Sequence, residues 1–219
     1  MKTRSLSLKV SPVIGVVSAE CIIPENSHCI ITLAHGAGAG MNHSFMVTLA
    51  QLLSEQGIAT LRFNFPFAEN KKGRPDIPAV AHATIASAIA NAQKLFPELP
   101  LFAAGKSFGG RMTSQYLSAH PDAAVKGIIF YGFPLHPPGK PSTERAEHLK
   151  EIKTPMLFLQ GTKDELAAWD LIEPVCKSLK FAELVKIEGA NHAFKAGKQN
   201  ILQLLADKTK EWIAKMIKK

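Results

Sequence analysis

The sequence predicts an α/β protein: a three-layer α/β/α sandwich around a mostly parallel, twisted sheet of about seven strands, with no large cap. Two observations lead to this prediction. Short apolar runs alternate along the chain with longer segments of helical spacing, the pattern of strands joined by crossover helices. In addition, 219 residues, 46% of them hydrophobic and 20% charged, fit one domain, residues 1–219, with a substantial core.

The apolar runs and their breakers place the elements in order. The expected strands cover residues 13–23, 29–34, 59–63, 101–104, 127–131, 156–160 and 182–187, with a weaker run at 6–10 before them. The expected helices cover residues 46–53, 80–96, 108–119, 146–151 and 167–179, the last interrupted by Pro174, and a C-terminal helix with Leu205, Trp212 and Ile213 on its apolar face. Glycine-rich, polar and proline-rich loops are expected at residues 35–42, 68–78 and 132–143. Because these loops follow strands of a parallel sheet, they should share the sheet edge at which ligands bind.

The stretch Leu101–Met112 carries the most informative motif. An apolar strand runs into Gly105-Lys106-Ser107-Phe108-Gly109, which fits G-x-S-x-G, and a helix follows at once. Strand, tight turn with a central serine, then helix is the context of a nucleophile elbow. The glycines should let strand and helix approach closely, and the serine should be held in a strained backbone conformation. The sequence therefore predicts Ser107 as a catalytic nucleophile.

Two residues downstream suit the partners of such a serine. Asp164 and His192 each follow an expected strand, and the order serine, acid, histidine is that of hydrolases built on such a sheet. His192 is expected to act as the base for Ser107, and Asp164 to orient the imidazole. Glu165 and Asp170 compete with Asp164 for the acid role, but Glu165 is expected to begin the next helix. His35 competes for the base role, although a histidine before a glycine-rich loop more often braces it.

Further candidates lie on the same expected edge. The backbone N–H groups of Ala37 and Phe108 are predicted to form the oxyanion hole. Four side chains are candidates for contacts with substrate, namely His35, Lys106, Arg111 and Asn64. The other six histidines, His28, His43, His82, His120, His136 and His148, are expected on the surface or in turns.

Composition narrows the classes of partner. A formal charge of +8 is spread along the chain without a basic stripe or nucleic-acid module, so no nucleic-acid partner is expected. The apolar runs are too short to span a bilayer, so we expect no membrane partner. The N-terminal stretch is faintly like a signal peptide, but Lys9 and Pro12 interrupt it, so we expect strands there and a cytoplasmic location. Three cysteines form neither a disulfide framework nor a metal-ligand spacing, and all three are expected to be buried thiols. No metal is expected, since no close pair of histidine ligands lies on one helix face.

Several short motifs together resemble a known family. The motifs are Leu33–Gly38, Leu61–Pro66, Ala104–Arg111, Gly161–Asp164 and Ala190–His192. In these motifs the chain is similar to α/β-hydrolases of the compact, dienelactone-hydrolase-like kind. More narrowly, it resembles a subfamily that includes a testis-expressed protein and a subunit of the non-specific lethal chromatin-modifying complex. The resemblance implies the α/β-hydrolase fold, the roles given above to Ser107, Asp164 and His192, and no cofactor. The serine stands where dienelactone hydrolases have cysteine, and one branch of the subfamily is associated with scaffolding.

The sequence leaves three hypotheses about function. The first is a serine hydrolase that cleaves an ester, thioester or related acyl bond of a small molecule through an acyl-enzyme. Basic residues on the loops of the expected site, Lys71, Lys72, Arg74, Lys106 and Lys140, indicate a substrate that carries negative charge. The second is a binding or scaffold protein that keeps the fold without catalysis. The third is an acyltransferase that uses the same three residues.

Overall fold

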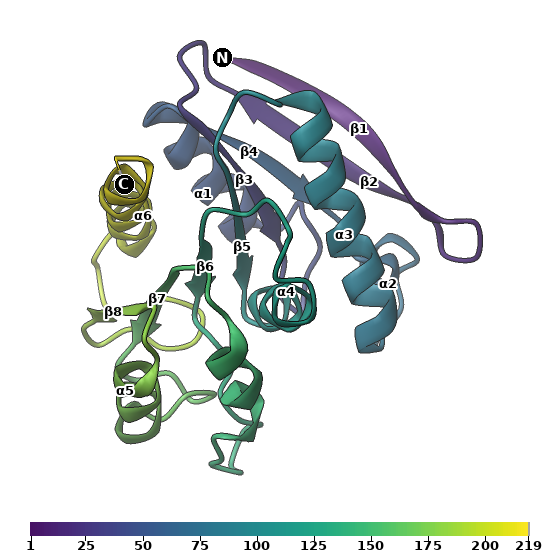
Figure 1. Ribbon diagram of the computed structural model, residues 1–219. Helices are drawn as coiled ribbons and strands as arrows, with labels where there is room; N and C mark the ends of the chain where they lie inside the picture. Colours follow the sequence, from purple (N-terminus) through teal and green to yellow (C-terminus); the bar gives the residue numbers. More distant parts are fainter. Residues whose placement is uncertain (219) are drawn as a thin grey trace.

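One eight-stranded sheet forms the centre of the molecule, with the strand order β1-β2-β4-β3-β5-β6-β7-β8 (Figure 1). The computed structural model describes residues 1–218. The strands are β1 (Lys2–Ser11), β2 (Gly15–Ile23), β3 (Cys29–Ala34), β4 (Ile58–Phe63), β5 (Leu101–Lys106), β6 (Ile128–Tyr131), β7 (Met156–Gly161) and β8 (Ala182–Ile187). From β4 to β8 all neighbours are parallel, whereas β1 and β2 form an antiparallel hairpin that pairs with β4.

The N-terminal hairpin differs from the expected elements. The weak apolar run at residues 6–10 is the middle of a ten-residue edge strand, so the sheet has eight strands. Val13, expected to begin a strand, lies in the hairpin turn instead and is 96% exposed. A hydrogen bond of 3.0 Å from Ile14 N to Ser11 Oγ closes that turn. The strand was expected to begin at Val13 because Val13, Ile14, Val16 and Val17 are β-branched, although Pro12 and Gly15 flank the turn.

Helices cover both faces of the sheet (Figure 1). One face carries α1 (Ser44–Glu55) and α6 (Ile201–Ile217). The other carries α3 (Pro78–Leu95), α4 (Phe108–Ala119), the 3₁₀ helix η1 (Glu144–Glu151) and α5 (Trp169–Ser178). Strands β3, β4 and β7 are buried along their whole length because both of their faces are covered, which explains why most of their residues are apolar. None of the helices within residues 1–218 combines the length and the apolar character that a bilayer crossing needs. One further short helix, α2 (Pro66–Glu69), follows β4.

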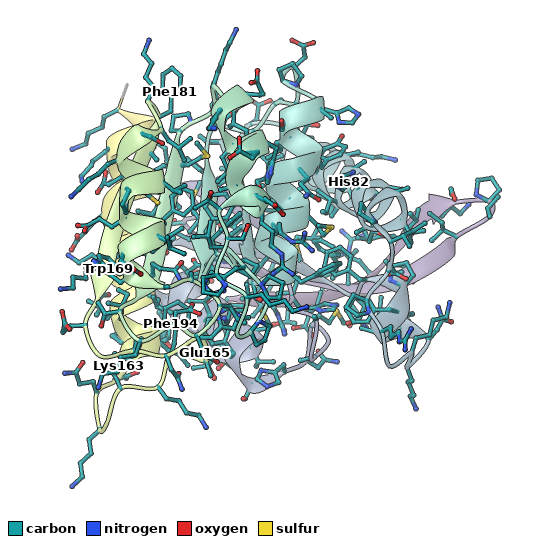
Figure 2. The ribbon with its side chains drawn as sticks, turned by 90° about the horizontal axis from the view of Figure 1, so that it is seen from below. His82, Lys163, Glu165, Trp169, Phe181 and Phe194 are labelled. Carbon is teal, nitrogen blue, oxygen red and sulfur yellow. The ribbon has the colours of Figure 1, made fainter. Side chains whose placement is uncertain are left out.

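The loops after the parallel strands gather at one edge of the sheet. Figure 2 shows Glu165 and Phe194, which follow β7 and β8, close together at the lower end of the molecule. Phe181, which precedes β8, lies at the opposite end in the same view. Residues far apart in the sequence therefore meet beyond the carboxyl ends of the strands, as expected for an open α/β sheet.

Candidate active site

Ser107 lies in a strained turn between β5 and α4. Its backbone has φ 51° and ψ −117°, a conformation that residues other than glycine rarely adopt. The neighbouring glycines are required by close packing. A Cβ at Gly105 would come within 2.3 Å of Gly110 N, and a Cβ at Gly109 within 2.5 Å of the carbonyl oxygens of Ala34 and His35. The turn therefore has the close approach of strand and helix that the motif predicts, and Ser107 stands at the N-terminus of α4.

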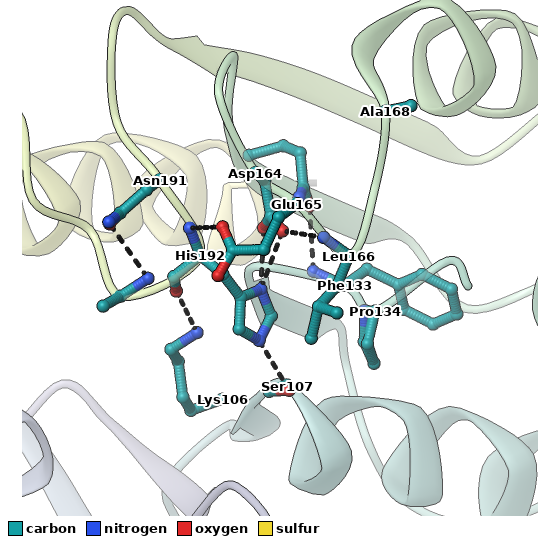
Figure 3. A network of polar contacts seen from close by, with 12 residues as sticks. Lys106, Ser107, Phe133, Pro134, Asp164, Glu165, Leu166, Ala168, Asn191 and His192 are labelled. Carbon is teal, nitrogen blue, oxygen red and sulfur yellow. Dashed lines mark hydrogen bonds and ion pairs between the residues drawn. The ribbon is translucent and has the colours of Figure 1, made fainter. Parts of the chain in front are cut away.

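Ser107, His192 and Asp164 form one hydrogen-bonded chain (Figure 3). Ser107 Oγ lies 2.8 Å from His192 Nε2. On the other side of the ring, Nδ1 lies 2.9 Å from Asp164 Oδ1 and 2.8 Å from Oδ2. A carboxylate can only accept, so Nδ1 carries the proton, and Nε2 is free to accept the proton of the serine hydroxyl. The structure thus brings the three predicted side chains together from the ends of β5, β7 and β8.

The carboxylate of Asp164 is buried and held by two further donors. Its Oδ2 accepts a hydrogen bond of 2.7 Å from Gln160 Nε2, and its Oδ1 accepts one of 2.8 Å from Leu166 N. Gln160 is itself fixed, because its Oε1 accepts from Phe133 N at 2.8 Å. Gln160 was not predicted as part of the site, since a glutamine inside an apolar strand has no motif that marks it. It is the one polar side chain of β7, and this is the signal that could have found it.

Glu165, which competed with Asp164 for the acid role, contacts the backbone of His192 and not its ring. It does not begin a helix as expected, because residues 165–168 form a turn and α5 starts only at Trp169. Its Oε2 accepts a hydrogen bond of 3.1 Å from the backbone N of His192 (Figure 3). The second rival, Asp170, lies in the first turn of α5. Of these carboxylates, Asp164 is the one that contacts the imidazole.

The glycine-rich loop after β3 is braced by buried polar side chains. His35 is fully buried: its Nδ1 donates to Gly36 O at 2.7 Å and its Nε2 accepts from Phe65 N at 3.0 Å. Burial lowers the pKa of His35 to about 4, so the ring is neutral. The loop's other end is clamped at Met41, whose N donates to Asn64 Oδ1 at 2.8 Å and whose O accepts from Arg62 Nη1 at 2.7 Å.

These contacts correct two predictions about substrate. His35 is fully enclosed, so its side chain does not contact substrate; it braces the loop, as its position before the glycines also suggested. Asn64 has both ends of its amide engaged, since Nδ2 donates to Glu69 Oε2 at 2.8 Å. Both side chains support the loop that carries Ala37 rather than the substrate itself.

A cavity of about 390 Å³ opens in front of Ser107. Ala37 lines it, and the amide of Phe108, the first of α4, adjoins Ser107. Within residues 1–218 neither the Ala37 nor the Phe108 amide donates a hydrogen bond to another protein group, so both are free for an anionic oxygen. The lining residues are Gly36, Ala37, Gly38, Ala39, His43, Phe45, Met46, Lys106, Ser107, Glu165, Leu166, His192 and Ala193.

Comparison with known proteins identifies the family of the chain. A family model described as "Alpha/beta hydrolase domain" matches residues 27–218. The chain belongs to the α/β-hydrolases. A curated relative, the AB hydrolase superfamily protein YisY of Bacillus subtilis, is 26% identical over 148 residues, which are 67% of this chain. This chain spans about half the length of that relative, with 51% of it covered.

Solved structures share this α/β-hydrolase fold across nearly the whole chain. Est1E from Butyrivibrio proteoclasticus, in a structure with ferulic acid bound, has a TM-score of 0.78 at 19% identity, over 98% of this chain and 100% of its own. A dienelactone hydrolase from Anabaena variabilis has a TM-score of 0.75 at 20% identity, over 97% of each chain. The likeness to dienelactone hydrolases read from the motifs is therefore confirmed for the fold. The narrower subfamily stays a prediction.

Of the two basic residues predicted to contact substrate in this α/β-hydrolase, Lys106 lines the cavity and Arg111 does not. Lys106 lines the cavity, and its Nζ donates a hydrogen bond of 2.6 Å to the backbone O of His192 (Figure 3). Arg111 lies one turn into α4, outside the lining, with its Nε buried and unpartnered among the described residues. The position of the cavity therefore does not support the prediction that Arg111 contacts substrate.

Two further predictions concern histidines and cysteines. His136 was expected on the surface or in a turn; it lies in the loop after β6 but is only 3% exposed. Its Nε2 accepts a hydrogen bond of 3.1 Å from Ala168 N, which ties this loop to the turn before α5. The three cysteines are buried and free, as predicted, and burial raises the pKa of Cys29 and Cys176 to about 12. Among the described residues no group of three or more His, Cys, Asp or Glu side chains could hold a metal ion.

Proposed function

We propose that this protein is a serine hydrolase that cleaves a small ester, thioester or related acyl bond through an acyl-enzyme on Ser107. One observation carries the proposal: Ser107 Oγ, His192 and the buried carboxylate of Asp164 stand in one unbroken hydrogen-bonded chain. A serine hydroxyl is a weak nucleophile until a base accepts its proton. In this hydrogen-bonded chain His192 supplies the base and Asp164 supplies the counter-charge.

The mechanism follows from the roles of these groups. Ser107 Oγ attacks the acyl carbon while its proton passes to His192 Nε2, and Asp164 stabilises the imidazolium. The carbonyl oxygen becomes an oxyanion that the amides of Ala37 and Phe108 stabilise. The intermediate collapses, and His192 returns the proton to the leaving alcohol or thiol. Water then attacks the acyl-enzyme with the same base, releasing the acid and the free serine.

The cavity favours small substrates. Its volume of about 390 Å³ is near the lower end for ligand sites, and its walls include Phe45, Met46 and Leu166. A short or medium apolar acyl group fits such walls better than a highly polar one.

The charges at the cavity are balanced rather than basic. Lys106 and Glu165 both line it, while Lys71, Lys72, Arg74 and Lys140 do not. The cavity therefore favours a neutral acyl ester over the anionic substrate indicated by the sequence. Salt dependence of kcat/KM on charged test esters would reveal an anionic preference if one exists.

Labelling with a fluorophosphonate probe tests the proposal directly. The purified protein should be labelled, and Ser107→Ala should not, because only an activated serine reacts with this probe. Ser118→Ala, a change at the far end of α4, is the matched control and should label like the wild type. An unlabelled wild-type protein between about pH 6 and 9, where a histidine base can be neutral, would favour the non-catalytic binding protein.

A series of p-nitrophenyl esters then defines the acyl group. We expect kcat/KM to be highest for short acyl chains and to fall once the chain exceeds the cavity. Product analysis with alcohol acceptors separates hydrolysis from acyl transfer. A cytoplasmic location and a small-molecule partner stay predictions.

A further inference from the structure

The turn that carries His192 is strained. This histidine turn, residues 191–195, follows β8 and is closed by a hydrogen bond of 2.9 Å from Phe194 N to Asn191 O. Asn191 Oδ1 accepts from the backbone N of Ala193 at 3.1 Å and of Lys195 at 3.0 Å. Phe194 has φ 59°, which is rare for a bulky residue and disfavoured by about 1–3 kcal/mol. Contacts from outside the turn must therefore maintain this conformation.

Lys106 supplies several of these contacts. Its Nζ donates to His192 O at 2.6 Å and lies 5.1 Å from the centre of the Phe194 ring and 5.8 Å from that of Phe45. The two rings are stacked, 5.9 Å apart, so the ammonium contacts both the main chain of the turn and its strained aromatic side chain. Among residues 1–218 no carboxylate lies within ion-pair distance of Lys106 Nζ.

Gly132, after β6, leaves room for this arrangement. A Cβ there would lie 3.2 Å from Lys106 Nζ and 3.4 Å from both Asp164 Oδ2 and Phe194 Cε2. The ammonium, the carboxylate and the strained ring thus surround one point. Since Gly132 also has φ 71°, a side chain is disfavoured there on two grounds.

We propose that Lys106 is a positioning residue whose protonated ammonium holds the histidine turn, and so keeps His192 Nε2 within reach of Ser107. The proposal rests on the proposed function, because it assigns Lys106 a part in that reaction. Lys106 acts through the main chain of His192 and not on the substrate. A base displaced by about 1 Å can lose on the order of 10²-fold in rate, so the hold on the turn matters for kcat.

The charge state of Lys106 makes the hold sensitive to pH. Burial lowers the pKa of Lys106 to about 8, against the opposing effect of Asp164 and Glu165. The other titratable groups around it are His192 itself, His43 of the segment before α1, and Tyr131 of β6, whose pKa burial raises. Below pH 8 the amine is charged and makes a charge-assisted hydrogen bond; above it the amine is neutral and the bond weakens. Activity should therefore fall as pH rises through about 8.

Lys106→Met tests the proposal, because methionine has a similar shape and no charge. We expect kcat to fall at least about tenfold at pH 7, with KM within about twofold, and the decline above pH 8 to disappear. Lys163→Met removes an exposed lysine from the turn after β7 and should keep the wild-type profile. A rise in KM with kcat unchanged would mean that Lys106 binds substrate, and it would overturn the proposal.

Amide hydrogen exchange gives a readout that does not depend on activity. In Lys106→Met the amides of residues 191–195 should exchange faster than in the wild type, while those of residues 108–112 should not change. Unchanged exchange in the histidine turn would overturn the proposal whatever the kinetics show. If the wild-type protein neither labels nor hydrolyses esters, the proposed function fails, and the exchange measurement still decides whether Lys106 holds the turn.

Discussion

Two strained turns meet at the site, and they are maintained in different ways. Ser107 has φ 51° and Phe194 has φ 59°. The turn at Ser107 is held by close main-chain packing, because Gly105 and Gly110 leave no room for a side chain between them and Gly109 lies against the carbonyl oxygens of Ala34 and His35. The turn at Phe194 is held by side chains from distant segments, among them Lys106 and Phe45.

The difference shows where each kind of strain is encoded. Close main-chain packing needs glycine at set positions, so the nucleophile turn has a sequence motif. Side-chain contacts across the fold can be made by many residue types, so the histidine turn has none. Three predictions, from the largest expected effect to the smallest, test this comparison.

The first prediction concerns the acid that orients the histidine. Asp164→Asn removes the anionic acceptor of Nδ1–H and the counter-charge of the imidazolium, so kcat on p-nitrophenyl acetate should fall roughly 10⁴-fold. Glu165→Gln keeps the hydrogen bond to His192 N and should lose less than about tenfold. Equal losses in the two variants would mean that the histidine turn depends on the summed charge and not on contact with the ring.

The second prediction concerns the main-chain packing of the nucleophile turn. In Gly109→Ala the new Cβ would lie 2.5 Å from the carbonyl oxygens of Ala34 and His35, so the free energy of unfolding should fall by about 4 kcal/mol. Gly73→Ala, with nothing within 4 Å, should change it by less than about 1 kcal/mol. Urea denaturation measures both. A small effect at Gly109 would show that the nucleophile turn can relax, contrary to the comparison.

The third prediction follows from the buried ammonium of Lys106, which contacts the histidine turn. The pKa of Lys106 is about 8 in the folded protein and 10.5 when unperturbed. Below pH 8 both states are protonated, and the folded state carries the full penalty of burying the charge. Between pH 8 and 10.5 the unfolded state binds the proton and the folded state does not, so stability rises with pH.

This change should appear as a difference between two proteins. From pH 7 to 10.5 the free energy of unfolding of the wild type should rise by about 3 kcal/mol relative to Lys106→Met. Comparing the variant at each pH cancels the titration of all other groups. A constant difference would mean that the pKa of Lys106 is the same in the folded and unfolded protein, so that the ammonium is not buried at the histidine turn.

The sequence predicted most of the framework of this site. The bounds of α4 and β8 were predicted to the residue, because the Gly105 turn and Pro121 flank α4 and the turn at Gly189 follows β8. The meeting of Ser107, Asp164 and His192 followed from their order and from the rule that parallel strands present their carboxyl ends at one edge. The N-terminal hairpin was predicted less well, since its turn at Val13 lacks glycine at the central positions.

What the sequence determined by itself is local: the alternation of strands and helices, the glycines that force the nucleophile turn, and the positions of Ser107, Asp164 and His192 after strand ends. Tertiary structure alone decided which polar groups pair with them. Gln160 contacts Asp164, Arg62 and Asn64 clamp Met41, and Lys106 contacts the turn of His192, all through side chains with no local motif. The physical reason is that backbone geometry depends on neighbours in the chain, whereas buried polar groups must find partners wherever folding places them.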